Sequence, residues 1–207
     1  MWRSLVDSFL ELLAPLGCAA CDRESEGRLF CLGCELSLEY AEEEDAAVLL
    51  YAGPIREAIQ RLKYRGRSDL GPRLSELMAE HALRLGPSVD RVLPIPLHPS
   101  RERARGYNQA ALLAAGVAKR LGVPLDRRSL LRIRITPPQA ELDREERLAN
   151  LRAVFEVAAP KGSLEGLRLM LVDDVMTTGA TLDAAAELLF EAGARRVEPL
   201  ILARAEA

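Results

Sequence analysis

Residues 167–202 constrain the fold more than any other part of the sequence. Residues 167–172 form a nearly continuous apolar run, which is typical of a strand buried on both faces of a parallel sheet. Residues 181–192 carry apolar side chains at helical spacing and stop before Gly193, and 197–202 form the next apolar run. A strand, a helix and a strand in this order predict a right-handed βαβ unit, and therefore an α/β fold with a mostly parallel sheet.

Two carboxylates and a polar turn follow the first of these strands. Asp173 and Asp174 can accept hydrogen bonds from neighbouring hydroxyls, such as those of a ribose, at the strand end where parallel sheets bind ligands. The next helix begins with backbone amides that favour a phosphate, and a glycine lets the backbone approach it closely. The segment 172–182 therefore predicts a site for a phosphorylated sugar, with candidate residues Asp173, Asp174, Thr177, Thr178, Gly179, Ala180 and Thr181.

Two other interpretations of this segment are weaker. A capped helix after a core strand explains a threonine and a glycine, but it leaves the adjacent carboxylates Asp173 and Asp174 unexplained. A carboxylate site for two metal ions explains the acidic pair, but it does not explain the Thr-Thr-Gly-Ala-Thr turn from Thr177 to Thr181.

All four cysteines fall near the N-terminus, as two C-x2-C pairs separated by nine residues: Cys18, Cys21, Cys31 and Cys34. This spacing suits a closed, structural zinc site with four thiolate ligands. A redox pair or disulfides remain the alternative. Because the pattern places the cysteines in a segment of their own, we expect loss of the metal to unfold that segment and to leave the α/β domain largely intact.

The whole chain divides into an N-terminal module at 1–46 and an α/β domain at 47–207, with the boundary in the acid-rich sequence that begins at Glu42. Residues 1–17 predict a short amphipathic helix, and no apolar run approaches the roughly 20 residues that span a bilayer. We therefore expect a cytoplasmic protein. Further helices are predicted at 53–64, 70–85 and 107–121, and short strands at 89–95, 130–135 and 153–157.

Basic residues are concentrated between 91 and 134, although the formal net charge of the chain is −3. Glu102 and Asp126 are the acids of that stretch, and Arg101, Arg103 and Arg105 lie in a segment that predicts a loop. A solvated charged face explains such a set. Single-stranded DNA binding is the functional alternative, but it usually needs aromatic side chains as well, and aromatic residues make up only 4% of the chain, Tyr64 and Tyr107 being the candidates.

Several motifs together resemble the ComF family, also called the ComFC or GntX type. They occur in the family's order and cover nearly the whole chain: the four cysteines, Leu62-Lys63-Tyr64, Pro94-Ile95-Pro96-Leu97, Arg105-Gly106-Tyr107-Asn108-Gln109, Pro138-Gln139, Arg147, Asn150 and the acidic segment. The resemblance implies a type I phosphoribosyltransferase-like domain joined to a small N-terminal zinc module with four cysteine ligands. Family members are linked to DNA uptake in natural transformation, and a relative is linked to gluconate utilisation.

The same resemblance implies residue roles and a ligand, phosphoribosyl pyrophosphate (PRPP). Asp173 and Asp174 would contact the ribose hydroxyls, Thr177 to Thr181 the 5′-phosphate, and Arg101 and Arg105 the pyrophosphate, with Mg²⁺ bridging the phosphates. Asp173, Asp174 and Arg105 would then be the catalytic residues. Residues 48–86 would form a hood over the site, and 136–148 a mobile loop that closes on substrate.

One departure bears on the reaction. Purine-salvage enzymes commonly carry an aspartate at the position of Thr177, and threonine does not act as a general base near neutral pH. Hypoxanthine-guanine salvage is therefore disfavoured. Two classes of function stay open: Mg²⁺-dependent phosphoribosyl transfer to an unidentified acceptor, and a non-catalytic competence protein that binds single-stranded DNA or senses PRPP.

Overall fold

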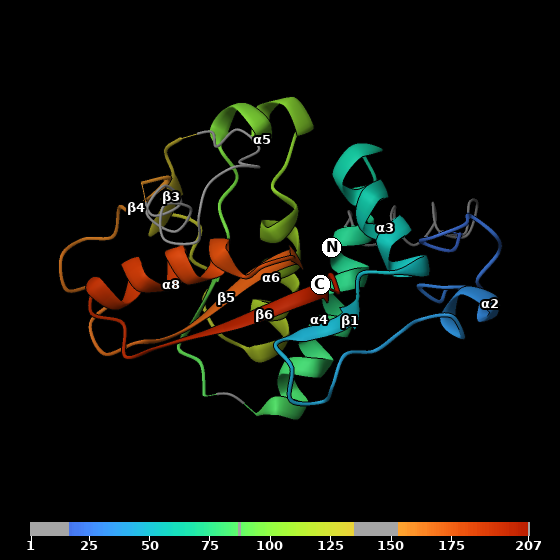
Figure 1. The fold of residues 1–207 in the computed structure, drawn as a ribbon, viewed down its shortest axis with the longest axis horizontal. Helices are drawn as coiled ribbons and strands as arrows, with labels where there is room; N and C mark the ends of the chain where they lie inside the picture. Colours follow the sequence, from blue (N-terminus) through green and yellow to red (C-terminus); the bar gives the residue numbers. More distant parts are fainter. Residues whose placement is uncertain (1–16, 87, 135–152, 207) are drawn as a thin grey trace, which may run out of the picture.

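A central parallel sheet organises the computed structural model, which describes residues 17–86, 88–134 and 153–206. The sheet has the order β1-β6-β5-β2, and every neighbouring pair is parallel. Its strands are β1 (Ala47–Leu50), β6 (Arg196–Arg204), β5 (Arg168–Met176) and β2 (Arg91–Pro94) (Figure 1). The predicted α/β fold with a mostly parallel sheet is confirmed.

Helices cover both faces of this sheet because side chains alternate between the faces along each strand. Met170 and Val172 of β5 pack into the core that contains α3 (Gly53–Tyr64), α4 (Leu70–Leu85) and α6 (Gln109–Leu121). Leu169 and Leu171 pack into the opposite core with α8 (Ala180–Glu191). An antiparallel pair of strands, β3 (Leu130–Arg132) and β4 (Phe155–Val157), contributes Leu130 and Phe155 to that second core.

Among the described residues, the predicted helices form where the sequence indicates, with one addition. Helix α6 ends at Gly122, whose φ of 70° is the left-handed conformation that the sequence predicts there. The segment predicted as an arginine-rich loop is partly helical, which corrects that prediction: α5 spans Pro99–Arg105. Its start is set by Pro99 and by His98, whose ring nitrogen accepts a hydrogen bond from the Ser100 amide at 3.2 Å.

Strand β5 is longer than its apolar run. The sequence places the end of the strand at Val172, but backbone pairing with β6 continues through Asp173 and Val175 to Met176. The acidic pair therefore lies within the strand and not in the turn after it. This pairing fixes the backbone of both carboxylates, so the site is built on a rigid element.

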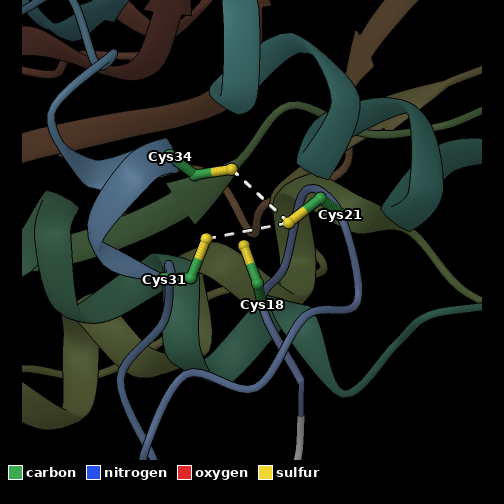
Figure 2. Close-up of side chains that lie close together, drawn as sticks. All are labelled: Cys18, Cys21, Cys31 and Cys34. Atoms are coloured by element: carbon green, nitrogen blue, oxygen red, sulfur yellow. Dashed lines mark hydrogen bonds between the residues drawn. The ribbon is translucent and has the colours of Figure 1, made fainter.

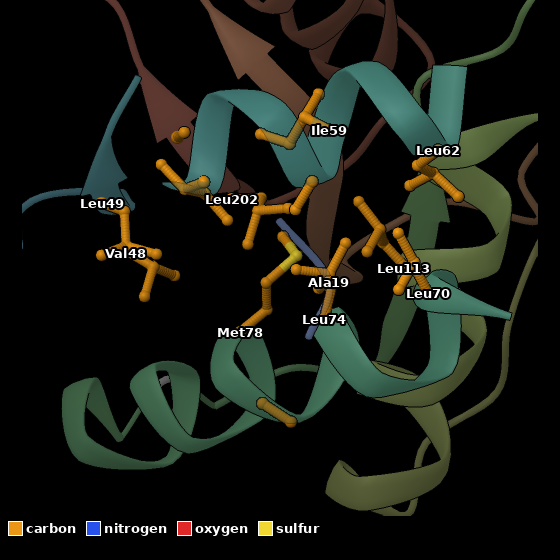
Figure 3. Packing of buried hydrophobic residues seen from close by; sticks show 14 of the residues in the cluster. Ala19, Val48, Leu49, Ile59, Leu62, Leu70, Leu74, Met78, Leu113 and Leu202 are labelled. Atoms are coloured by element: carbon orange, nitrogen blue, oxygen red, sulfur yellow. The ribbon is translucent and has the colours of Figure 1, made fainter. Parts of the chain in front are cut away.

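The cysteine segment shares a core with the α/β elements. Cys18, Ala19 and Phe30 are buried in the same cluster as residues of α3, α4 and α6, and α2 (Leu32–Glu35) follows them. Figure 3 shows Ala19 in this cluster with Ile59 and Met78. The expectation that the α/β core lies apart from this segment is wrong, because a chain of this length buries most by packing its segments together. The boundary between 46 and 47 stays a sequence interpretation.

Several sequence predictions fall outside the described residues: the amphipathic helix at 1–17 apart from its last residue, the whole loop at 136–148 with Pro138, Gln139 and Arg147, and Asn150. Within the described part of the chain, no helix is long and apolar enough to cross a membrane.

Candidate functional site

Asp174 is the buried member of the acidic pair. Its position on β5 has the same parity as Met170 and Val172, so its side chain enters the face covered by α3. Only 3% of Asp174 is exposed, and its Oδ2 atom lies 2.9 Å from the Lys63 ammonium at the end of α3. Lys63 belongs to the Leu62-Lys63-Tyr64 motif, and the structure places its charge against the acidic pair.

Asp173 is the half-buried member of the pair, and it lies beside the loop Thr177–Thr181 that follows β5. Its Oδ1 atom accepts a hydrogen bond from the Asp174 amide at 2.8 Å. Burial, and next the charge of Asp174, raise the pKa of Asp173 well above its usual value, whereas the charge of Lys63 acts in the opposite direction. The two carboxylates are thus electrostatically coupled, and Asp173 is the one that lines an accessible hollow.

The polar turn after β5 forms that hollow, which has a volume of about 40 Å³ and is lined by Asp173 and by residues 175–182. Thr177 and Thr178 are exposed, and Gly179 has a φ of 79°. This left-handed conformation favours glycine, which places the first amides of α8 beside the hollow. The candidate residues Asp173 and Thr177 to Thr181 therefore line one hollow, in a geometry that suits an anionic group next to hydroxyls, whereas Asp174 lies on the face covered by α3.

Two of the remaining motifs hold the neighbouring elements in place. The Tyr107 hydroxyl donates a hydrogen bond to the Leu62 carbonyl, which ties the start of α6 to the end of α3. The Arg105 guanidinium donates to the Gln109 side chain and lies 5.5 Å from the centre of the Tyr64 ring. Tyr107 is thus a packing residue, while Arg105 and the exposed Tyr64 lie at the end of α3 that carries Lys63.

Arg132 and the cavity beside it were missed as parts of the site at the level of sequence. The cavity measures about 290 Å³ and lies between the end of β2, α5 and β3, where Pro94, His98 and Arg132 are among its lining residues. Burial, and next the charge of Arg101, lower the pKa of Arg132, while Asp173 raises it. These charges therefore interact at the same edge of the sheet. A three-residue strand gives too weak a pattern to assign Arg132 to a site.

The four cysteine sulfurs point to a common centre (Figure 2), and all lie within 4.8 Å of one another. Cys21 Sγ lies 3.7 Å from that of Cys31 and 3.6 Å from that of Cys34. Four thiolates bound to Zn²⁺ at about 2.3 Å would lie roughly 3.8 Å apart, so the cluster fits a tetrahedral zinc ion. The predicted ligand set is thus brought together.

Arg23 stabilises a thiolate in this cluster. Its Nε atom donates to Cys21 Sγ at 3.2 Å, and this contact lowers the pKa of Cys21 to about 6. Burial raises the pKa of Cys34 to about 12. Thiolates are the form of cysteine that binds metal, and a neighbouring arginine offsets the negative charge of a four-thiolate centre.

These features define a class of protein. A parallel sheet with a carboxylate pair at one strand end, followed directly by a Thr/Gly loop and a helix, is the architecture of a phosphoribosyltransferase domain, here with a four-cysteine cluster before it. The sequence profile of the phosphoribosyl transferase domain matches residues 108–207, which include β5, the loop and α8.

Curated relatives extend the similarity beyond residues 108–207. The DNA utilization protein YhgH of Salmonella typhi is 33% identical over 159 residues, covering 74% of this chain and 69% of that protein. Competence protein ComFC of Bacillus subtilis is 30% identical over 182 residues, covering 85% and 72%. Competence protein F of Haemophilus influenzae is 29% identical over 209 residues, covering 91% and 90%. The chain belongs to this ComF family of phosphoribosyltransferase-like proteins.

Among solved structures, a glutamine PRPP amidotransferase from B. subtilis aligns with 65% of this chain and 26% of its own, at 22% identity and a TM-score of 0.46.

Proposed function

We propose that this chain binds PRPP at the end of β5 and transfers its phosphoribosyl group to an acceptor. One observation carries the proposal: a carboxylate and the loop at a helix N-terminus line the same hollow. A ribose 5-phosphate unit carries both hydroxyls and a phosphate monoester. Charge-assisted hydrogen bonds to hydroxyls and backbone amides to phosphate are the chemistry that such a unit requires.

The residue roles follow the geometry. We assign the ribose hydroxyls to Asp173 and Asp174, of which Asp173 is the more exposed, and the 5′-phosphate to the loop Thr177–Thr181. We assign the pyrophosphate, with its Mg²⁺, to the neighbouring cavity beside Arg101 and Arg132. Arg105 keeps its proposed role at the same edge, although its guanidinium also contacts Gln109 and Tyr64.

In the transfer, the bond between the ribose C1 atom and pyrophosphate breaks with its electron pair leaving on oxygen, and the acceptor forms a new bond to C1. The arginines stabilise the leaving pyrophosphate, and the carboxylates stabilise the cationic sugar. Thr177 supplies no general base, so the acceptor must be a nucleophile that needs none from this loop.

We assign zinc to the four cysteines as a structural ion, because four thiolates leave no open coordination position. The names of the relatives further support a role of this chain in the use or uptake of DNA, and a cytoplasmic location agrees with that role.

Turnover is tested by incubating the purified, zinc-loaded protein with PRPP, Mg²⁺ and a panel of nucleobases, and measuring pyrophosphate release. We expect release above the spontaneous rate with at least one acceptor, and loss of that release in Asp173→Asn. Release that is equal in the wild type and the variant contradicts a catalytic role for this pair. Binding of PRPP without release with any acceptor favours a sensor.

Single-stranded DNA binding is the second candidate function, favoured by the exposed Arg101 and Arg103 on α5 and by the names of the relatives. Electrostatic binding weakens steeply with salt. The double variant Arg101→Ala/Arg103→Ala should reduce that salt dependence, whereas Arg196→Ala, at the opposite end of the sheet, should leave it unchanged. Binding that ignores salt removes this candidate.

A further inference from the structure

The ammonium of Lys63 is the cation that contacts the acidic pair directly in the described part of the chain. It lies 2.9 Å from Asp174 Oδ2, and the side chains of Lys63 and Asp174 are 18% and 4% exposed. Losing one partner of a buried ion pair leaves the other charge without compensation, which is costly. The contact therefore fixes the position of the Asp174 carboxylate within the buried face of β5.

The end of α3 that carries Lys63 is held from several sides. Arg61, two residues earlier on the helix, contacts Asp22 of the cysteine segment at 2.6 Å and Glu57 at 3.1 Å. The Leu62 carbonyl accepts from Tyr107, and the Tyr64 ring packs against Arg105. Lys63 thus has little freedom to move, so its ammonium is presented to the pair before a ligand arrives.

We propose that Lys63 is a positioning residue of the PRPP site: it holds the Asp174 carboxylate in place, and so shapes the acidic pair that receives the ribose. This inference rests on the proposed function for its ligand. Lys63 acts through Asp174, and the residues assigned to the phosphates lie elsewhere.

The charges around the pair explain what removal of Lys63 does. The negative charges of Asp173 and Asp174 repel each other, and the positive charge of Lys63 on α3 offsets this repulsion. Arg132 of β3 interacts more weakly with Asp173 and is itself repelled by Arg101 of α5. Since Lys63 lowers the pKa of Asp173, its loss raises that pKa further, and the pair holds a proton over a wider range of pH. A protonated carboxylate is a poorer acceptor for a hydroxyl.

The first test is calorimetry with PRPP and Mg²⁺ at mildly acidic, neutral and mildly alkaline pH. We expect Lys63→Met to weaken binding roughly tenfold or more at neutral pH and to regain much of it as the pH rises. Lys63→Arg should restore most of the affinity. Arg65→Met removes a charge from the same end of α3, where Arg65 is 61% exposed and contacts Glu57 at 3.2 Å, and should bind as the wild type does.

Three outcomes of this titration overturn the inference: wild-type affinity in Lys63→Met, an equal loss at every pH, or an equal loss in Arg65→Met. The second outcome would mean that the lysine serves packing alone.

A second measurement is independent of PRPP. Unfolding of Lys63→Met, Asp174→Asn and the double variant measures the coupling between the two residues. We expect Lys63→Met to destabilise the wild type far more than it destabilises Asp174→Asn. Equal effects in both backgrounds overturn the inference. If the wild type does not bind PRPP, the proposed function fails, and this cycle still decides whether Lys63 holds Asp174.

Discussion

Asn108 connects the edge of the sheet to the helix beside it. Its side-chain oxygen accepts from the amides of Ala110 and Ala111 at 2.9 and 3.4 Å, which caps α6, and its Nδ2 atom donates to the Ile95 carbonyl at 3.0 Å. Asn108 is only 5% exposed. Since Ile95 follows β2, this residue fixes the distance between β2 and α6 next to the ligand site.

Replacing Asn108 by alanine should therefore be costly. The cap contributes about 1 kcal/mol, and a buried carbonyl without its donor costs about 1–3 kcal/mol more, so we expect the free energy of unfolding to fall by about 2 kcal/mol or more. Urea unfolding measures this. Asn108→Ser, which retains a capping oxygen, should fall less, and a loss below about 0.5 kcal/mol in Asn108→Ala would contradict these roles.

At the scale of elements, α3 joins the cysteine segment to the acidic pair. Asp22 contacts Arg61 at 2.6 Å and Arg67 at 3.3 Å, and Arg61 is buried to 8% exposure. These contacts lower the pKa of Asp22, chiefly through its hydrogen bond with Arg61. Asp22 has a φ of 59°, a conformation that asparagine also tolerates, so Asp22→Asn changes charge with little backbone strain.

We expect Asp22→Asn to lower the free energy of unfolding by about 1 kcal/mol, a value reduced for the exposure of Asp22, and to leave the zinc content unchanged. Its matched control is Glu26→Gln, because Glu26 also has a positive φ and its ion pair with Arg28 is long, at 3.9 Å. Equal stability of the two variants would show that the contact with Arg61 contributes nothing.

Helices were predictable from sequence because their signals are local. The apolar spacing predicts α3 and α4 with the bounds that the structure shows, and a glycine marks the end of α6. The length of β5 was not predictable, since its last residues are held by pairing with β6 and not by burial of apolar side chains. Helix α5 was not predicted, because its charged composition is also typical of a loop. The helix begins at Pro99 and is capped by His98.

The candidate site likewise contains residues that could be predicted from local sequence and residues that could not. The acidic pair and the loop are contiguous in sequence, so their proximity follows from one strand and one turn. The partner of Asp174 lies on a helix far away in the sequence, and only the packing of α3 on the sheet brings Lys63 to it. Arg132 was not predicted as a site residue for the same reason, because the position of β3 depends on its pairing with β4.

At the scale of the whole molecule, the cysteine cluster is part of the common core. Cys18 is fully buried, and Ala19 packs with residues of α3 and α4 such as Ile59 and Met78. We therefore expect Cys21→Ser to lose zinc and to lower the melting temperature of the entire chain in a single transition. Metal analysis and thermal unfolding followed by circular dichroism measure both effects.

A matched control is Leu36→Ser, a surface change just after α2 at a residue that is 78% exposed, which should retain zinc and stability. Two separate transitions in Cys21→Ser, or a melting temperature equal to that of the wild type, would contradict a shared core. An absence of zinc from wild-type protein purified without oxygen would contradict the metal assignment itself.

The central claim concerns the hollow at the end of β5, and calorimetry with PRPP and Mg²⁺ tests it without knowledge of the acceptor. We expect the wild type to bind, and Asp173→Asn to lose about 1.5–3 kcal/mol, which is roughly tenfold or more in affinity. Gly179→Val should lose more, because a branched side chain strains the φ of 79° and blocks the approach of phosphate. Both variants should retain the zinc of the wild type. A wild-type protein that does not bind PRPP, or two variants that bind it as tightly as the wild type, would contradict the account.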